Sequence, residues 1–270
     1  VVMLELIYQG WAEYAPQAGS YVEEFATQGE ALSMLTKDAA GSLVKNHAKD
    51  TTYRYESLQS EEWKNTAMQL GINGTSYYFS LANSSISDFF SEMYLNTPWE
   101  QHYENLDGRT ILDRLASVKY FVISGDNFRY LSYGYNKEKG SAGKGKSECR
   151  AYENENALPL GYTYDSYIPE SEYEKMDVVK KQQALMDGVV LEESTLPEAS
   201  VDADNENIQY RMETGDGCAL SKGAIRVTKE GAQLKLVFHG LTDSENYLIA
   251  DNLDYDSLSP REPSGNSQWK

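Results

Sequence analysis

The pattern of apolar and polar positions predicts short strands and helices along most of the chain. Alternation with a period of two predicts a strand over 52–57, in which Tyr53 and Tyr55 share one face. A more continuous apolar run predicts a central strand over 117–124, and 128–135 predicts another strand after it. Helical spacing places helices at 1–15, 20–37, 61–70, 86–94, 109–116 and 172–187. Ser85 or Ser87 is the expected cap of the fourth of these helices, and Ser171 of the last.

The periodicity changes to two in the last quarter of the chain. Alternation there predicts strands at 208–212, 224–228, 233–239 and 246–250, which is typical of a β-sandwich. So few strands leave a jelly-roll-like sandwich incomplete, unless it borrows strands from upstream or the domain extends past this chain. We therefore predict an α+β fold with a helical lead-in over 1–50, a mixed α/β domain with short helices over 51–197, and the β-sandwich region over 207–270. The acidic segment 197–206 is the expected linker, so the strands after it should not share a sheet with 117–124.

The segment 152–162 predicts a kinked corner between two strands. Asn154 and Asn156 favour a turn, and Pro159 removes a backbone donor and restricts the residue before it. Residues 160–164 then predict a second strand. The two carboxamides either satisfy backbone groups beside the strand 117–124 or face a ligand. In the first case each substitution by alanine should destabilise the fold by ~1–3 kcal/mol. In the second case stability should not change and binding should fall.

Charge excludes one class of partner. The chain has 24 basic and 42 acidic residues and a net charge of -18, a surface that repels nucleic acid. The 136–148 segment is the exception, and we predict a flexible loop that is either solvated or contacts a polyanion or lipid headgroup through Lys137, Lys139, Lys144 and Lys146. Lys119 lies within the predicted central strand, so its ammonium group must either reach water or pair with a carboxylate. Cys149 and Cys218 form either one disulfide or two free thiols.

The sequence shows no self-contained catalytic motif. It has no Gly-x-Ser-x-Gly elbow, and none of its three histidines has another histidine or a cysteine as a metal-like partner at helical spacing. Two acidic groups suggest calcium but lack the glycine and terminal glutamate of an EF-hand loop: Asp202, Asp204 and Glu206, and Asp251, Asp254 and Asp256. We therefore predict no catalytic residue, metal or cofactor. The mean hydropathy of -0.59 fits a globular chain, and no apolar run approaches the ~18–20 residues that cross a bilayer.

Several segments resemble a known family when read in order. They are 53–56, 74–80, 118–122 and 154–162, followed by Lys181-Gln182-Gln183-Ala184-Leu185. Together they are similar to the YfhO-like family of bacterial membrane proteins over roughly residues 50–195. That family is grouped with polytopic glycosyltransferases that use polyprenyl-phosphate sugars and carry a soluble part outside the cell. Arg54, Lys119, Tyr120, Asn154, Asn156 and Pro159 occupy the motif positions, and we expect a ligand-binding or structural role for them.

The resemblance implies an extracytoplasmic, non-catalytic domain of a multi-pass protein at the bacterial plasma membrane. Such a domain positions an acceptor or supports a membrane active site that decorates cell-envelope polymers such as lipoteichoic acid. Its partners are then the membrane part of the same polypeptide and a cell-envelope glycan or teichoic acid, and the chain alone should transfer no sugar. The opening run 1–7 is then the end of a transmembrane helix; otherwise it is a buried helix. The alternatives are a secreted carbohydrate-binding protein that uses its C-terminal tyrosines and a purely structural cell-surface domain.

Overall fold

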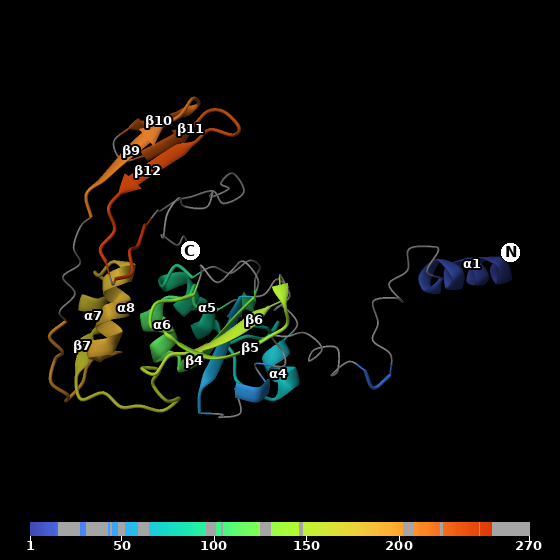
Figure 1. Cartoon of the computed structure of the whole chain (residues 1–270), viewed down its shortest axis with the longest axis horizontal. Helices are drawn as coiled ribbons and strands as arrows, with labels where there is room; N and C mark the ends of the chain where they lie inside the picture. The colour runs from blue at the N-terminus through green and yellow to red at the C-terminus, as the bar shows by residue number, and fades with distance from the viewer. Residues whose placement is uncertain are drawn as a thin grey trace. The chain divides into compact units, whose positions relative to one another are not determined.

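A computed structural model describes most of the chain, and Figure 1 shows its elements. The described residues are 1–15, 28–30, 43, 45–47, 52–58, 65–95, 101–103, 105–124, 131–145, 148–201, 208–221, 224–242 and 244–249. They divide into two compact units, Val1–Tyr162 and Thr163–Lys270. This division falls ahead of the acidic segment 197–206.

The first unit is built on one mixed sheet with the strand order β1-β4-β6-β5. These strands are β1 (Arg54–Leu58), β4 (Val118–Ser124), β6 (Cys149–Glu153) and β5 (Lys137–Ala142). Strand β1 runs parallel to β4, whereas β6 is antiparallel to both β4 and β5. The apolar run predicted to be central therefore lies inside the sheet, between β1 and β6.

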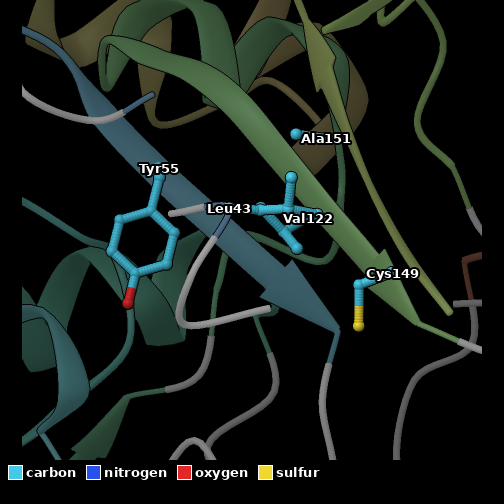
Figure 2. Packing of buried hydrophobic residues seen from close by; sticks show 5 residues of the cluster. All are labelled: Leu43, Tyr55, Val122, Cys149 and Ala151. Atoms are coloured by element: carbon cyan, nitrogen blue, oxygen red, sulfur yellow. The ribbon is translucent and has the colours of Figure 1, made fainter. Parts of the chain in front are cut away.

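One face of this sheet carries an apolar cluster drawn from segments far apart in the sequence. Figure 2 shows its buried members, Tyr55 on β1, Val122 on β4, Cys149 and Ala151 on β6, and Leu43. Helix α4 (Thr66–Leu70) adds Ala67 and Leu70 to the cluster. Burial of a leucine or valine side chain, as at Leu43 and Val122, contributes about 1.5–3 kcal/mol to the stability of the fold. The cluster therefore stabilises this face of the sheet.

The opposite face of the sheet is closed by a tyrosine among buried polar groups. The Tyr135 ring packs 5.2 Å from that of Phe121 on β4. Its hydroxyl donates to the Val118 carbonyl at 2.9 Å and to Asp113 Oδ2 at 3.3 Å, and Asp113 lies on α6 (Thr110–Leu115). Burial, followed by the nearby charges of Asp113 and Glu56, raises the pKa of Tyr135 well above its ordinary value. Tyr135 therefore joins α6 to the central strand as a neutral hydrogen-bond donor.

A small aromatic layer lies between β1 and α6 in the sequence. It contains β2 (Tyr77–Tyr78), α5 (Ser84–Glu92) and β3 (His102–Tyr103). Tyr103 stacks on Tyr77 with ring centroids 5.0 Å apart, and Phe90 meets Tyr103 edge-on at 4.9 Å. The Ser87 and Tyr103 hydroxyls lie 2.6 Å apart, so α5 is bound to β3 by both packing and a hydrogen bond.

The first element of the chain, α1 (Val2–Tyr14), is a helix without buried residues. Its apolar side chains are exposed, among them Leu4 at 72% and Ile7 at 67%. The expected helix over 1–15 is thus confirmed. The choice between the end of a transmembrane helix and a buried helix for the opening run 1–7 stays a prediction.

The second unit begins with a parallel pair of strands joined by two helices. These elements are β7 (Tyr167–Pro169), α7 (Glu170–Tyr173), α8 (Val178–Asp187) and β8 (Val189–Leu191). Its core includes Ile168, Tyr173 and Ala184. Gly188 precedes β8, and a Cβ at this position would lie 3.2 Å from both Ile168 Cγ1 and the Ser166 carbonyl oxygen. The close approach of these strands therefore favours glycine there.

The described C-terminal strands form two antiparallel pairs. They are β9 (Tyr210–Thr214) with β12 (Leu234–Phe238), and β10 (Cys218–Ser221) with β11 (Ala224–Val227). None of these strands shares a sheet with β4, as predicted. The α+β class is confirmed, whereas the incomplete, jelly-roll-like β-sandwich predicted over 207–270 stays a prediction, because the described strands there form two separate antiparallel pairs. Both cysteines are free thiols.

Several local predictions were wrong for identifiable reasons. The described part of 128–135 is a turn, with Gly134 at φ +90°, where a strand was expected. Residues 137–142, predicted as flexible, form β5 because they pair with the outer edge of β6. Residues 160–164 form no strand, since Leu160 N donates instead to the Thr52 carbonyl.

Helix boundaries and one C-terminal strand also differ from the prediction. Asn83, not a serine, caps α5, because its side chain accepts from Ser85 N. Asp177 accepts from Val179 N and Lys180 N, and this cap divides the helix predicted over 172–187 into α7 and α8. The described residues of 246–250 are not a strand, while β10 was not predicted. The predicted helix over 20–37 lies outside the described residues, except for the turn at 28–30.

We expect the Tyr135 hydroxyl to be a main polar support of the first unit. Tyr135→Phe removes the donor and leaves the Val118 carbonyl and the Asp113 carboxylate inside the core. The free energy of unfolding should fall by ~1–3 kcal/mol in urea denaturation. Tyr133→Phe is the matched control, because Tyr133 is 54% exposed, and it should change stability by less than about 0.5 kcal/mol. Equal stability of the two variants would contradict this assignment.

Candidate functional site

Two β-bulges direct lysine side chains toward the same carboxylate. In the β1–β4 pair, Arg54 faces Val118 and Tyr55 faces Tyr120, so Lys119 is the extra residue. In the β5–β6 pair, Glu138 faces Tyr152 and Gly140 faces Ala151, so Lys139 is the extra residue. A bulge bends its strand and reorients the extra side chain. Here the two bulges flank Glu153, which lies on β6 between β4 and β5.

The result is a lysine cluster, which we define as Lys119, Lys137 and Lys139 around Glu153. The Lys139 ammonium lies 3.0 Å from Glu153 Oε2, the Lys137 ammonium 3.7 Å from the same atom, and the Lys119 ammonium 3.6 Å from Oε1. Lys137 also pairs with Glu155 at 2.6 Å. Among the described residues, three ammonium groups thus face two carboxylates, which leaves one positive charge in surplus within this set.

The carboxylate of the cluster is buried, whereas its lysines are partly exposed. The Glu153 side chain is only 10% exposed, whereas those of Lys119, Lys139 and Lys137 are 22%, 31% and 51% exposed. Burial would raise the pKa of Glu153, but the Lys139 ammonium, supported by Lys119 and Lys137, lowers it below the ordinary value. Glu153 is therefore ionised at neutral pH and holds the three lysines at one end of the sheet.

Aromatic rings surround Lys119. Its ammonium lies 4.2 Å from the centroid of the Tyr53 ring and 5.9 Å from that of Tyr120. Both distances are within the range of cation–π attraction, which restrains the lysine further. The His47 ring lies 6.4 Å from the Tyr120 ring. The site therefore combines cations with partly exposed aromatic surface.

The motif positions identified from the sequence gather at this end of the sheet. Arg54 N donates to the Ser117 carbonyl, and the Arg54 guanidinium donates to the Ala116 carbonyl at 2.5 Å. Burial lowers the pKa of Arg54. Asn154 N donates to the Lys119 carbonyl at 2.8 Å, so the corner continues the ladder beyond β6. Arg54, Lys119, Tyr120 and Asn154 are thus held together by backbone pairing.

The two asparagines of the corner have different environments. Asn154 is 1% exposed, and its Oδ1 accepts from Asn156 N at 2.9 Å, which closes the turn. The side chain of Asn156 points to solvent and belongs to an exposed residue, as does that of Pro159. After the turn, Leu158 N donates to the Arg114 carbonyl and Leu160 N to the Thr52 carbonyl. The corner is therefore hydrogen-bonded both to the end of α6 and to the residues that precede β1.

Sequence reasoning missed the residue at the centre of the cluster. Glu153 was expected only as part of the corner segment 152–162, although Lys119 was expected to reach water or pair with a carboxylate. The structure identifies Glu153 as the carboxylate that pairs with Lys119. Lys137 and Lys139 were noted as part of a basic segment, but their place on a bulged edge strand was not. Alternation places Glu153 and Tyr152 on opposite faces of β6, yet no local pattern signals which lysines approach it.

The cluster can hold an anion by charge and hydrogen bonding. Each lysine ammonium carries three donors and no acceptor. Within the described residues no group of His, Cys, Asp and Glu side chains is arranged to bind a metal ion, and the calcium candidates fall in stretches the structure does not describe. Among the helices that are described, none is both long and apolar enough to traverse a bilayer.

Comparison with known proteins relates the chain to one protein family. A family model described as "Bacterial membrane protein YfhO" matches residues 1–268. The "Uncharacterized protein YfhO" of Bacillus subtilis (strain 168) is 26% identical over 192 residues, which cover 65% of this chain. The match spans only 22% of that relative, so the chain corresponds to a fraction of its length. No solved structure matches significantly.

We expect the two corner asparagines to differ in their effect on stability. Asn154→Ala removes a buried acceptor that Asn156 N uses, and it should lower the free energy of unfolding by ~1–3 kcal/mol. Asn156→Ala should change it by less than about 0.5 kcal/mol, because this side chain is exposed. Chemical denaturation measures both. A large loss in Asn156→Ala, or none in Asn154→Ala, would show that the turn is not held in this way.

The ionised form of Glu153 should give a pH-dependent contribution to stability. Its pKa is lowered in the folded state, so its contribution is complete above the ordinary value of 4.5 and is lost as the pH falls through the lower folded value. The free energy of unfolding of the wild-type protein should exceed that of Glu153→Gln by ~1–2 kcal/mol at neutral pH. This difference in stability should become smaller as the pH is lowered. Glu155→Gln is the control, because its side chain is 67% exposed. A difference between wild type and Glu153→Gln that does not depend on pH would contradict the ionised pairing.

Proposed function

Because the chain belongs to the YfhO family of bacterial membrane proteins, we propose that it forms an extracytoplasmic, non-catalytic domain of such a protein. The observation that carries this proposal is the family match, which covers residues 1–268. The relative from Bacillus subtilis is much longer than the matched region. In this proposal the parts of the polypeptide beyond this chain cross the membrane and hold the active site.

The activity we propose for the whole protein is the transfer of a sugar from a polyprenyl phosphate to a cell-envelope polymer. Teichoic acid, including lipoteichoic acid, is the proposed acceptor. The domain positions that acceptor or supports the membrane active site, and its partner is the membrane part of the same polypeptide. The lysine cluster supports an acceptor-positioning role, since it concentrates cations in a chain with a net charge of -18.

A secreted carbohydrate-binding protein is the competing proposal. Its supporting observation is the exposed aromatic and aliphatic surface of the C-terminal strand pairs, where Tyr210 is 62% and Val227 is 54% exposed. Tyrosine offers both an apolar ring and a hydroxyl to a sugar. Within the first proposal, the same strands belong to the β-sandwich expected over 207–270, and this surface is covered by other parts of the longer polypeptide.

Cysteine labelling in intact bacteria tests the proposed orientation. Glu155 lies on the exposed corner of the first unit, so Glu155→Cys introduces an accessible thiol. In the full-length protein, with Cys149 and Cys218 replaced by serine, a membrane-impermeant maleimide should label this cysteine before the cells are lysed. The labelled protein should remain with the membrane fraction, whereas a secreted domain would be recovered from the medium.

A buried cysteine provides the control for this experiment. The single-cysteine protein that keeps Cys149 should react only after denaturation, because Cys149 is 5% exposed. If Glu155→Cys reacts only once the membrane is permeabilised, the domain is cytoplasmic and the proposal is wrong.

A further inference from the structure

The lysine cluster has the features of an anion-binding site rather than of a saturated ion pair. The three ammonium groups surround a single buried carboxylate, and Glu155 is the only other acid that the described contacts place on them. Glu138 and Glu148 instead pair with Arg150. Arg150 faces Ile123 across β4 and β6, on the opposite side of the sheet from Val122 and Ala151. Counted over the part of the chain that the structure describes, one positive charge is therefore left over on the Glu153 side.

The order of burial determines which groups an incoming ligand meets. Glu153 lies beneath the lysines with a side chain that is 10% exposed, while Lys137 is 51% and Lys139 31% exposed. A ligand that approaches from solvent therefore contacts ammonium groups before it reaches the carboxylate. Glu153 and the two bulges limit the freedom of these lysines, which lowers the entropy that binding must overcome.

The chemistry of the cluster selects a phosphate-type anion with an adjoining polyol. Lysine binds phosphate as a compact charge with several donors. The Lys119 ammonium lies over the Tyr53 ring, 4.2 Å from its centroid, so a ligand held by that ammonium has an aromatic side chain close by. A tyrosine offers an apolar ring and a hydroxyl, which match the carbon skeleton and the hydroxyl groups of a polyol.

We infer that Lys119, Lys137 and Lys139 bind one phosphodiester group of a soluble polyol-phosphate polymer, with the polyol lying against Tyr53. This inference deepens the proposed function, because it names the chemical group by which the acceptor is held. A membrane surface is the less suitable source of phosphate. Attachment to anionic lipid uses clusters of about four to eight basic residues, and the remaining surface of this acidic chain opposes it.

Direct binding measurements on the 270-residue chain test the inference. Isothermal titration calorimetry with soluble, acyl-free polyglycerol phosphate should show binding that weakens as salt is added, because the cluster is partly exposed. Lys139→Gln and Lys137→Gln should each weaken binding by about fivefold, the loss expected for one partly exposed charge-assisted contact. Lys175→Gln and Lys229→Gln remove the same charge from other exposed ion pairs and should alter affinity less than about twofold.

The remaining results would each overturn the inference. Absence of binding by the wild-type chain excludes the site, and equal losses in all four variants indicate attraction by overall charge only. Binding to phosphatidylglycerol vesicles but not to the soluble polymer would assign the site to a lipid headgroup instead. Thermal melts of each variant confirm folding. Lys137→Gln is the variant least expected to disturb the fold, because the Lys137 side chain is half exposed. Loss of this binding would leave the cysteine-labelling test of orientation unaffected, so the two proposals fail separately.

Discussion

The burial of β4 on both faces is the constraint from which the first unit is built. Val118, Phe121, Val122 and Ile123 are each 1% exposed or less, so every neighbouring element must cover this strand. Leu43, Ala67 and Leu70 pack on one face beside the apolar residues of β4 and its neighbouring strands, and Tyr135 covers the other face while bonding the Val118 carbonyl. A strand buried on both faces cannot shift its register without exposing apolar side chains, which makes its two ends fixed reference points.

The candidate site lies where this rigid strand begins. Lys119 follows Val118 at once, and the bulge there allows a lysine to leave a strand that is otherwise apolar. A carboxylate as buried as Glu153 must be paired, since an isolated buried charge costs several kcal/mol. The same ion pairs therefore satisfy a requirement of folding and hold three cations near one another. If the lysine cluster binds a ligand as proposed, the same ion pairs serve both folding and binding.

The corner 154–162 connects the site to the rest of the unit. Its backbone donors reach the Lys119, Arg114 and Thr52 carbonyls in turn, so it joins β4, α6 and the start of β1. Ser117, between α6 and β4, adopts a positive φ of 66° within this arrangement. The motif segments that identify the family are thus largely those that shape one end of the sheet. The binding of a ligand at this end of the sheet is a separate proposal.

Local patterns in the sequence determined the α+β class, the positions of β1 and β4, and the need of Lys119 for water or a carboxylate. These depend on the period of apolar residues and on the cost of burying charge, both of which a single segment carries. The tertiary structure alone decided that 137–142 is an edge strand, that 160–164 is not a strand, and that Glu153 gathers the lysines. Each of these outcomes depends on which backbone groups of distant segments pair, and above all on the register that creates two bulges. Hydrogen bonds between segments far apart in the sequence set that register, so no local pattern contains it.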